Sequence, residues 1–216
     1  MVINNIKQNH IGIFLGFSGY LSYVLLDSMI KKFLVSSYST LEIYFFISIF
    51  TFIPILITLF FSKSWNVLIN NKIHIQILRG ILALIMGLLI INSFKKHSLS
   101  EVYPILFSTP LILTIFSYFF LKEKVGLRRW LAVLLGFFGV LIVSRPGTMH
   151  FTMSLFGLFI AAIILAVNII IIRNFSKSQS AIAFAFYGSA TGVVMAGIPL
   201  INNFIYPTFF DFIIFV

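Results

Sequence analysis

Few side chains in this chain can take part in chemistry, and several of them fall close together in one predicted helix. Glu101, Pro104 and Ser108 stand at positions i, i+3 and i+7, so they share one side of an α-helix, with Tyr103 beside them. Glu101 can bind a cationic group or exchange a proton, while Pro104 and Pro110 each remove a backbone donor and leave carbonyl oxygens free. We therefore expect this face to border a ligand cavity and the prolines to bend the helix.

Two other carboxylates stand where apolar segments end or begin. Asp27 closes the first such segment, four residues after Tyr23, and Glu42 opens the second. An ionised group in apolar surroundings is costly, so it usually faces a cavity or a partner. Tyr23, Asp27 and Glu42 are therefore candidate cavity residues together with Glu101. The alternative is that the carboxylates pair with lysines in the connecting loops, at positions 31, 32, 95 and 96.

Amides and one further tyrosine complete the candidate cavity residues. Asn92 and Asn168 lie deep within apolar segments, where an amide can hydrogen-bond a ligand or, equally, hold two helices together. Tyr187 follows a similar helix junction later in the chain and is included for that reason.

Motifs for catalysis or metal binding are missing from the sequence. Cysteine is absent, and the four histidines share no ligand spacing. Neither a paired-carboxylate site nor a glycine-rich phosphate loop occurs. We expect no enzymatic activity, no metal and no cofactor.

The composition determines which kind of structure must position these residues. The chain is 60% hydrophobic and 9% charged, with a mean hydropathy of +1.10, which leaves too little polar surface to cover a water-soluble domain. The net charge of +10 does not indicate a nucleic-acid partner, because the Lys and Arg residues fall in short clusters between apolar runs. The sequence predicts a membrane protein.

Apolar runs long enough to cross the membrane as helices recur along the chain. About 20 residues are needed for a hydrocarbon core of about 30 Å. We predict helices at 11–30, 41–61, 77–94, 101–121, 128–144, 154–173 and 181–201, followed by a shorter apolar piece at 205–216. Prolines are common in membrane helices, so Pro104 and Pro110 also have an explanation without any function.

The distribution of basic residues predicts the orientation. With the N-terminus inside and the connections alternating, ten Lys and Arg residues fall on the inner side and five on the outer side. The densest cluster, at 122–129, then lies inside. We expect Glu123 to pair within this basic cluster, and Arg79 to extend to lipid headgroups from the inner end of its helix.

The chain repeats a short pattern. Residues 30–46 and 172–188 align at an offset of 142, which pairs two large apolar residues and one serine: Ile30 with Ile172, Phe33 with Phe175 and Ser36 with Ser178. Five predicted helices separate the copies, and an odd number of crossings inverts the second copy.

Residues 78–147 resemble the EamA-type members of the drug/metabolite transporter superfamily. The resemblance is carried by "LRG" at 78–80, Pro110, the Glu123 turn, "RRW" at 128–130 and "RPG" at 145–147, and by a glycine pair; its signature residues are Arg79, Glu123, Arg128, Arg129, Trp130, Gly136 and Gly139. The segment "DSMIKKFL" at 27–34 is similar to the branch that takes up S-adenosylmethionine. The resemblance implies two inverted five-helix halves, ten helices in all, with a substrate cavity between them.

Glycine stripes should mark close helix contacts, because small residues let two backbones approach. These stripes are Gly12, Gly16 and Gly19; Gly80, Ala83 and Gly87; Gly136 and Gly139; and Gly188 and Gly192.

We therefore expect an all-α, polytopic transmembrane helix bundle with about seven to eight of the family's ten helices. Residues 1–147 form the first repeat, and residues 148–216 an incomplete second repeat of two to three helices. An intact relative is expected to run to about 287 residues, so we interpret the chain as a fragment or a prematurely ended product.

The expected function is secondary transport of a small polar or amphipathic metabolite of the amino-acid, nucleoside or S-adenosylmethionine type. The expected location is the bacterial inner (cytoplasmic) membrane. The expected partners are the lipid bilayer, a small-molecule substrate and either a second copy or a complementing fragment, without nucleic acid. The alternative is a non-transporting membrane remnant or an assembly partner.

Overall fold

A computed structural model describes residues 2–69, 72–122, 124–144, 152–176, 179–202 and 204–215, and the regular secondary structure within them is entirely helical. The predicted all-α class is confirmed. Two parts of the predicted signature, Glu123 and the "RPG" segment at 145–147, lie outside the described residues.

The helices follow the predicted apolar runs closely. In chain order they are α1 (Val2–Met29), η1 (Ile30–Leu34), α2 (Thr40–Ser62), η2 (Trp65–Leu68), α3 (Ile73–Lys96), α4 (Leu99–Leu106), α5 (Thr109–Phe120), α6 (Leu127–Ser144), α7 (Met153–Phe175), α8 (Ala181–Gly197), η4 (Ile198–Leu200) and α9 (Phe209–Phe215).

Five segments in the described part of the chain are long and apolar enough to cross a membrane. They are Thr40–Ser62, Ile73–Lys96, Leu99–Phe120, Met153–Phe175 and Ala181–Leu200. A helix suits this setting because it satisfies its backbone hydrogen bonds internally, where lipid offers none.

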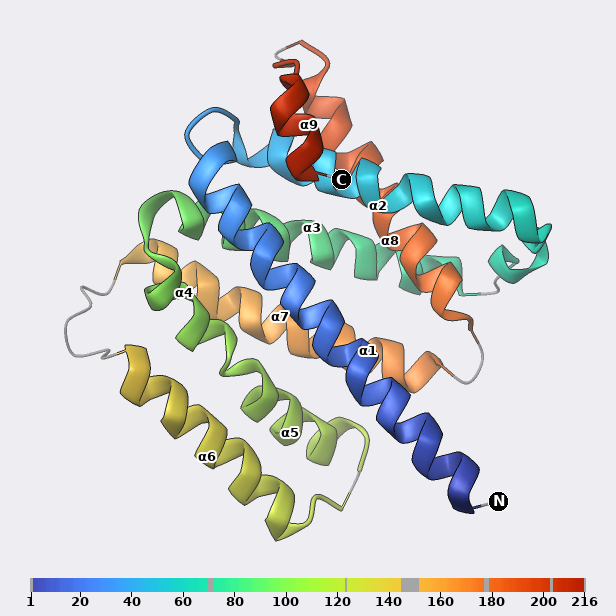
Figure 1. Cartoon of the computed structure of the whole chain (residues 1–216), viewed down its shortest axis with the longest axis vertical. Helices are drawn as coiled ribbons and strands as arrows, with labels where there is room; N and C mark the ends of the chain where they lie inside the picture. Colours follow the sequence, from blue (N-terminus) through green and yellow to red (C-terminus); the bar gives the residue numbers. More distant parts are fainter. Residues whose placement is uncertain are drawn as a thin grey trace.

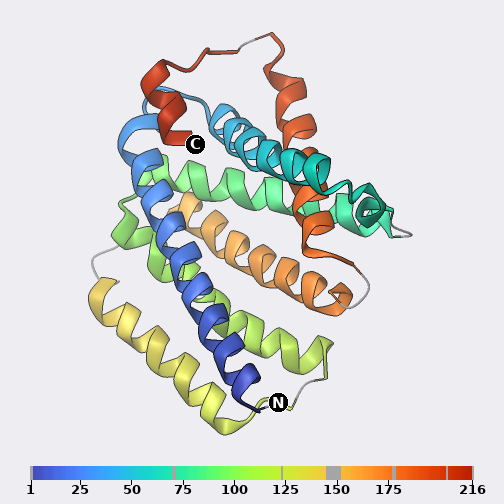
Figure 2. The ribbon, with the colours of Figure 1, turned by 45° about the vertical axis from the view of Figure 1, so that its right-hand side comes forward.

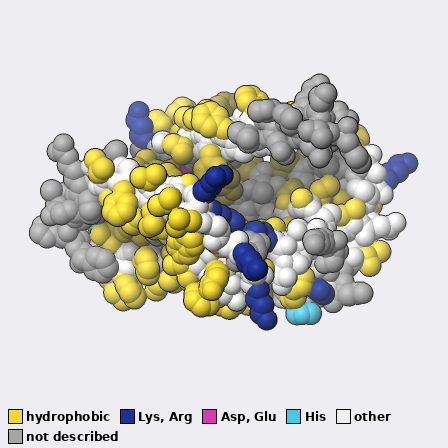
Figure 3. Space-filling model, turned by 90° about the horizontal axis from the view of Figure 1, so that it is seen from below, with side chains coloured by type: hydrophobic (Ala, Val, Ile, Leu, Met, Phe, Trp, Pro, Cys, Tyr) yellow, Lys and Arg dark blue, Asp and Glu magenta, His cyan; other side chains and the backbone are white. Residues whose placement is uncertain are grey.

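The outer surface is apolar. Large side chains such as Phe61, Ile142 and Met153 are 80%, 76% and 83% exposed. Figure 3 shows hydrophobic side chains over much of one face, with Lys and Arg side chains between them. Such a surface is suited to lipid rather than water, and the protein is an integral membrane protein.

The predicted helix at 101–121 is divided in two. α4 ends at Leu106 and α5 begins at Thr109, with Pro110 in its first turn. Because Pro110 has no backbone N–H, the carbonyl oxygen one turn earlier loses its helical partner. The hydroxyl of Ser108 donates to the carbonyl of Ile105 at 2.6 Å within the break. The predicted bend is confirmed, and the single helix is corrected to two.

The centre of the bundle is formed by α2, α3, α7 and α8. α3 packs against α7 and α8, and α2 packs against α8. Figures 1 and 2 show α3 between α2 and α7. Ala161, Ala162 and Ala166 of α7 are fully buried, which lets neighbouring helices approach closely.

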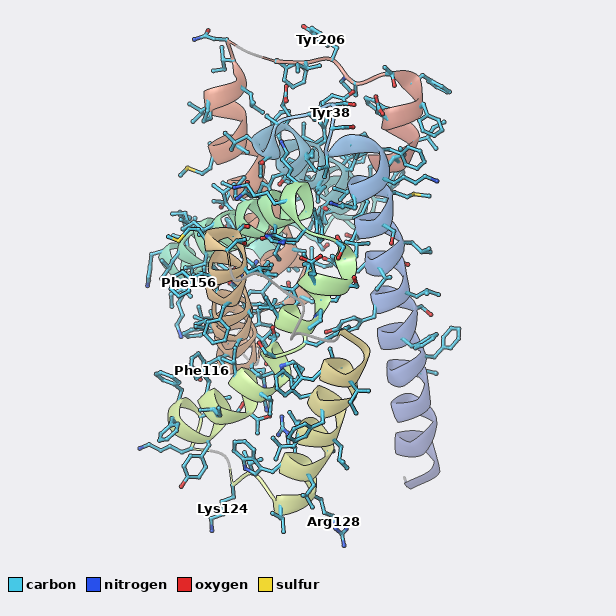
Figure 4. The ribbon with its side chains drawn as sticks, turned by 90° about the vertical axis from the view of Figure 1, so that its left-hand side faces the viewer. Tyr38, Phe116, Lys124, Arg128, Phe156 and Tyr206 are labelled. Carbon is cyan, nitrogen blue, oxygen red and sulfur yellow. The ribbon has the colours of Figure 1, made fainter. Side chains whose placement is uncertain are left out.

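Helices α2 and α3 run antiparallel, and so do α3 and α7. The end of α2, the start of α3 and the end of α7 lie on the right in Figure 1, while the end of α3 and the start of α7 lie on the left. Figure 4 places Lys124 and Arg128 at the end of the molecule formed by α5 and α6, far from Tyr38 and Tyr206.

The glycine stripes have two different outcomes. A Cβ at Gly80, Gly87, Gly188 or Gly192 would lie within 3 Å of a neighbouring side chain, so these glycines are needed for close packing. On α1 and α6 the prediction is wrong: at Gly12, Gly16, Gly19, Gly136 and Gly139 a Cβ would meet nothing within 4 Å. Figure 1 shows α1 crossing in front of the other helices, and Figure 4 shows it along one side of the molecule.

The starts of α2 and α8 are alike. Ser39 caps α2 by accepting from the backbone of Glu42, and Ser180, 141 residues later, caps α8 by accepting from the backbone of Ala183. Their spacing is one residue shorter than the predicted offset of 142. The division into two repeats stays a prediction.

Candidate functional site

A cavity of about 690 Å³ lies among α1, α2, α3, α7 and α8. Along α3 it is lined by Arg79, Ala83, Met86, Ile90 and Phe94, whose spacing of three to four residues places them on one face. From Arg79 to Phe94 the helix rises about 22 Å at 1.5 Å per residue. The cavity therefore follows much of a membrane-spanning helix.

Arg79 lies at the N-terminal end of the α3 wall of this cavity. The residue is 9% exposed, and its Nη2 donates a hydrogen bond to the carbonyl oxygen of Phe184 in α8. Its guanidinium carbon lies 5.4 Å from the centre of the Phe184 ring, a cation–π distance. The Nε atom has no hydrogen-bond partner among the described residues. The expectation that Arg79 reaches lipid headgroups is wrong, because the guanidinium is enclosed by protein.

Gly188 makes room for this guanidinium. A Cβ at position 188 would lie 2.8 Å from Nη2 of Arg79. Three residues before Arg79, the side chain of Gln76 is fully buried and donates to Gln179, which lines the cavity. Arg79 is thus held by the backbone carbonyl and the ring of Phe184, and no described carboxylate lies within 4.0 Å of it.

One face of α2 supplies hydroxyl groups to the cavity wall. Tyr44, Ser48 and Thr51 are spaced by four and three residues and all line the cavity. The Tyr44 ring fits because Gly87 and Gly192 lack side chains: a Cβ at Gly87 would lie 2.3 Å from a ring carbon. Sequence reasoning missed this stripe, although its helical spacing was visible in the chain.

Asp27 and Tyr23 of α1, two of the candidate residues, line the same cavity. The hydroxyl of Tyr103 in α4 donates to Oδ2 of Asp27 at 3.0 Å. Lys31, one turn after Asp27, donates to the carbonyl oxygen of Phe94 at the end of α3. Asp27 therefore lies toward the end of the cavity opposite Arg79.

The alternative expectation of lysine–carboxylate pairs is not met. Lys31 and Lys95 donate to backbone carbonyl oxygens, of Phe94 and Tyr38 respectively, the latter at 2.9 Å. Among the described residues, the one salt bridge joins His97 to Glu101.

Glu42 has a structural position. It is 1% exposed, and its carboxylate accepts from the backbone N–H groups of Ser39 at 2.7 Å and Ile205 at 2.8 Å. With the Ser39 hydroxyl it completes a capping box at the start of α2. Glu42 therefore does not line the main cavity, contrary to the expectation made from the sequence. Its carboxylate instead connects the start of α2 to the segment before α9.

Glu101 also lies away from the main cavity. Its carboxylate contacts Nδ1 of His97 at 2.9 Å and the Ser98 hydroxyl at 2.7 Å, and the side chain is 34% exposed. His97 in turn contacts the hydroxyl of Ser154, at the start of α7, at 2.7 Å. The carboxylate of Glu101 lies where α3, α4 and α7 meet. It does not line the main cavity, which corrects the expectation made from the sequence.

A second cavity, of about 520 Å³, is bordered by part of the predicted Glu101 face. It is apolar and lies between α1, α4 and α6, where Tyr103 and Pro104 face Gly136 and Gly139. The glycines predicted to form a helix contact therefore line open space.

The remaining candidates line neither cavity. Asn92 is partly buried, Pro110 sits in the α4–α5 break, and the hydroxyl of Tyr187 donates to the carbonyl of Leu68 at 2.8 Å. Asn168 is 6% exposed, and its amide has no hydrogen-bond partner in the described part of the chain. Arg128, Arg129 and Trp130 lie in the first turn of α6.

Comparison with protein families supplies the decisive match. The model of the EamA-like transporter family matches residues 10–145, more than half of the chain. The chain belongs to this family. The recognition made from the sequence motifs is confirmed, including similarity to the branch that takes up S-adenosylmethionine.

Curated relatives include S-adenosylmethionine uptake transporters from two Rickettsia species. The protein of Rickettsia bellii is 27% identical over 186 residues, covering 86% of this chain and 63% of the relative. That of Rickettsia felis is 27% identical over 178 residues, covering 82% and 60%. A riboflavin transporter of Vibrio cholerae is 42% identical over 50 residues, 23% of this chain and 17% of the relative. The chain thus spans less than two thirds of the length of these relatives.

A solved protein structure has the same fold. It superposes with a TM-score of 0.66 at 15% identity, covering 91% of this chain and 70% of the other.

Proposed function

We propose that the protein is a secondary transporter that moves a small polar or amphipathic metabolite across a bacterial inner membrane, with its N-terminus in the cytoplasm. The observation that carries this proposal is the main cavity. It runs along α3 inside a bundle of membrane-crossing helices and offers both charged and hydroxyl groups. Polar groups at membrane depth usually mark a substrate pathway.

Membership of the EamA-like transporter family supports the same function. S-adenosylmethionine is the first substrate to test, because relatives from Rickettsia carry that activity in their names. The break between α4 and α5 supplies a position where one helix can change direction during alternating access.

Transport is tested by uptake of radiolabelled S-adenosylmethionine into proteoliposomes, driven by its gradient, by exchange or by a proton gradient. Saturable uptake above that of empty liposomes is expected. Uptake indistinguishable from empty liposomes, for S-adenosylmethionine, riboflavin and a panel of amino acids and nucleosides, would favour the non-transporting alternative.

Two matched variants connect transport to the cavity. Ala83→Phe introduces a ring into the cavity wall of α3, and Ile85→Phe introduces the same ring at a side chain that is 42% exposed on the outer surface of that helix. Ala83→Phe is expected to reduce uptake at equal amounts of inserted protein, while Ile85→Phe transports like the parent. Equal uptake by both variants would exclude this cavity as the substrate site.

A further inference from the structure

We propose that Arg79 binds a carboxylate of the transported metabolite, so that the substrate class is an elongated molecule with a carboxylate at one end and a cationic or hydrogen-bond-donating group at the other. This assignment rests on the proposed transport function and adds the chemistry of recognition to it.

The first argument is the lack of a counter-ion. A buried guanidinium is strongly destabilising unless an opposite charge compensates it. Arg79 is 9% exposed within a membrane-spanning helix, yet no described carboxylate lies within 4.0 Å of it. Its protein contacts are the carbonyl oxygen and the ring of Phe184. An anionic ligand group would complete this site.

The second argument is geometric. Arginine presents five donors in a planar fork that matches the two oxygens of a carboxylate. The contacts to Phe184 hold the guanidinium in place, and Nε is enclosed by protein, whereas Nη1 makes no hydrogen bond to another described residue. Because Gly188 has no side chain, the fork lies directly against the α8 backbone. The arginine is therefore fixed in position with donor capacity unused.

The third argument is the distribution of polarity along the cavity. Beyond Arg79, the α3 wall is apolar at Ala83, Met86 and Ile90, and the Tyr44 ring forms the facing wall. The carboxylate of Asp27 lies toward the opposite end, near the end of α3. A cation at one end and an anion at the other favour a ligand with complementary ends. S-adenosylmethionine, with an amino-acid carboxylate at one end and an adenine amine at the other, has this form.

The experiment measures binding to the purified full chain in detergent by ligand-dependent thermal unfolding. Two pairs of ligands differ in the carboxylate: S-adenosylmethionine with its decarboxylated form, and methionine with methioninamide. In the parent protein, a carboxylated ligand is expected to bind at least tenfold more tightly than its partner. If neither pair shows this preference, the proposal is wrong.

Three variants assign the preference to Arg79. Arg79→Gln is expected to abolish it, and Arg79→Lys to reduce it, because lysine keeps the charge but lacks the fork. Arg173→Gln is the matched control: this exposed arginine at the end of α7 contacts Ser117 and does not line the cavity. If Arg79→Gln is not recovered folded, Arg79→Lys carries the test. A tenfold preference retained in the Arg79 variants would overturn the assignment.

The phosphate of a lipid headgroup could bind Arg79 through the same oxyanion chemistry, so a further experiment distinguishes a lipid from a carboxylated substrate. Phosphatidylglycerol is titrated into the parent and the Arg79 variants. Stabilisation by this lipid that depends on Arg79, and that carboxylated ligands do not compete with, would replace the substrate role by a lipid site. Failure of vesicle uptake with an intact carboxylate preference would instead contradict the transport function and leave the binding site standing.

Discussion

Replacing Gly188 with alanine is expected to displace the Arg79 guanidinium without removing its charge. The new Cβ would lie 2.8 Å from Nη2, 3.6 Å from Cζ and 3.8 Å from Nη1. Ordinary contact begins at about 3.4 Å, so Nη2 must move by about 0.6 Å. The group that must yield is the far end of a flexible side chain, so the helix backbone need not shift.

The displacement should affect binding more than stability. Recognition geometry must be held within about 0.5 Å, and a hydrogen bond to a charged group contributes about 1.5–3 kcal/mol. Losing part of this interaction predicts about a tenfold weaker affinity for the carboxylated ligand, or about 1.4 kcal/mol. Alanine gains up to about 1 kcal/mol of helix propensity over glycine, which offsets a small rearrangement.

The assay compares S-adenosylmethionine with its decarboxylated form in the Gly188→Ala protein. Gly16→Ala in α1 is the matched control, because a Cβ there meets nothing within 4 Å. The reasoning is refuted if Gly188→Ala keeps the parent's preference for the carboxylate. It is also refuted if both ligands weaken equally, since that result would indicate a change in cavity shape.

Three further expectations concern other parts of the chain. Glu101→Gln should keep the parent's ligand affinity and lower the free energy of unfolding by at most about 1 kcal/mol, because the contact between Glu101 and His97 is partly exposed. A loss of uptake at equal amounts of inserted protein would instead indicate that Glu101 contacts the substrate. Burial raises the pKa of Asp211, but hydrogen bonds from Thr208 and Tyr38 lower it by more, so the pKa of this carboxyl is below its ordinary value. These hydrogen bonds to the Asp211 carboxylate therefore stabilise the fold above about pH 4, and the stabilisation is lost as the pH falls through the folded-state pKa. Limited proteolysis of the α9 segment should therefore increase on acidification in the parent, and a profile that is flat with pH, or unchanged in Asp211→Asn, would contradict this. Reporter fusions after Lys63, Lys96 and Arg129 should read inside, outside and inside, and an outside signal at Arg129 would invalidate the orientation.

The positions of the helices could be predicted from the sequence because spanning a membrane is a local requirement. A run of about 20 apolar residues suffices whatever its neighbours are. The segment predicted at 41–61 is the helix Thr40–Ser62, and the segment at 154–173 is Met153–Phe175. The bend near Pro110 was also predictable, since a missing backbone donor acts on its own helix.

The direction that each polar side chain faces was decided by tertiary structure. Arg79, Glu42 and Glu101 all lie near helix ends, where a side chain can turn to headgroups, to a cap or to a cavity. Arg79 faces inward because α8 presents the carbonyl of Phe184 and the gap at Gly188, about 105 residues later in the chain. Glu42 instead completes a cap. In a helix that is apolar on all sides, the periodicity that would reveal the inward face is absent. The rotation of each helix is then set by packing with its neighbours, and the site residues follow from that rotation.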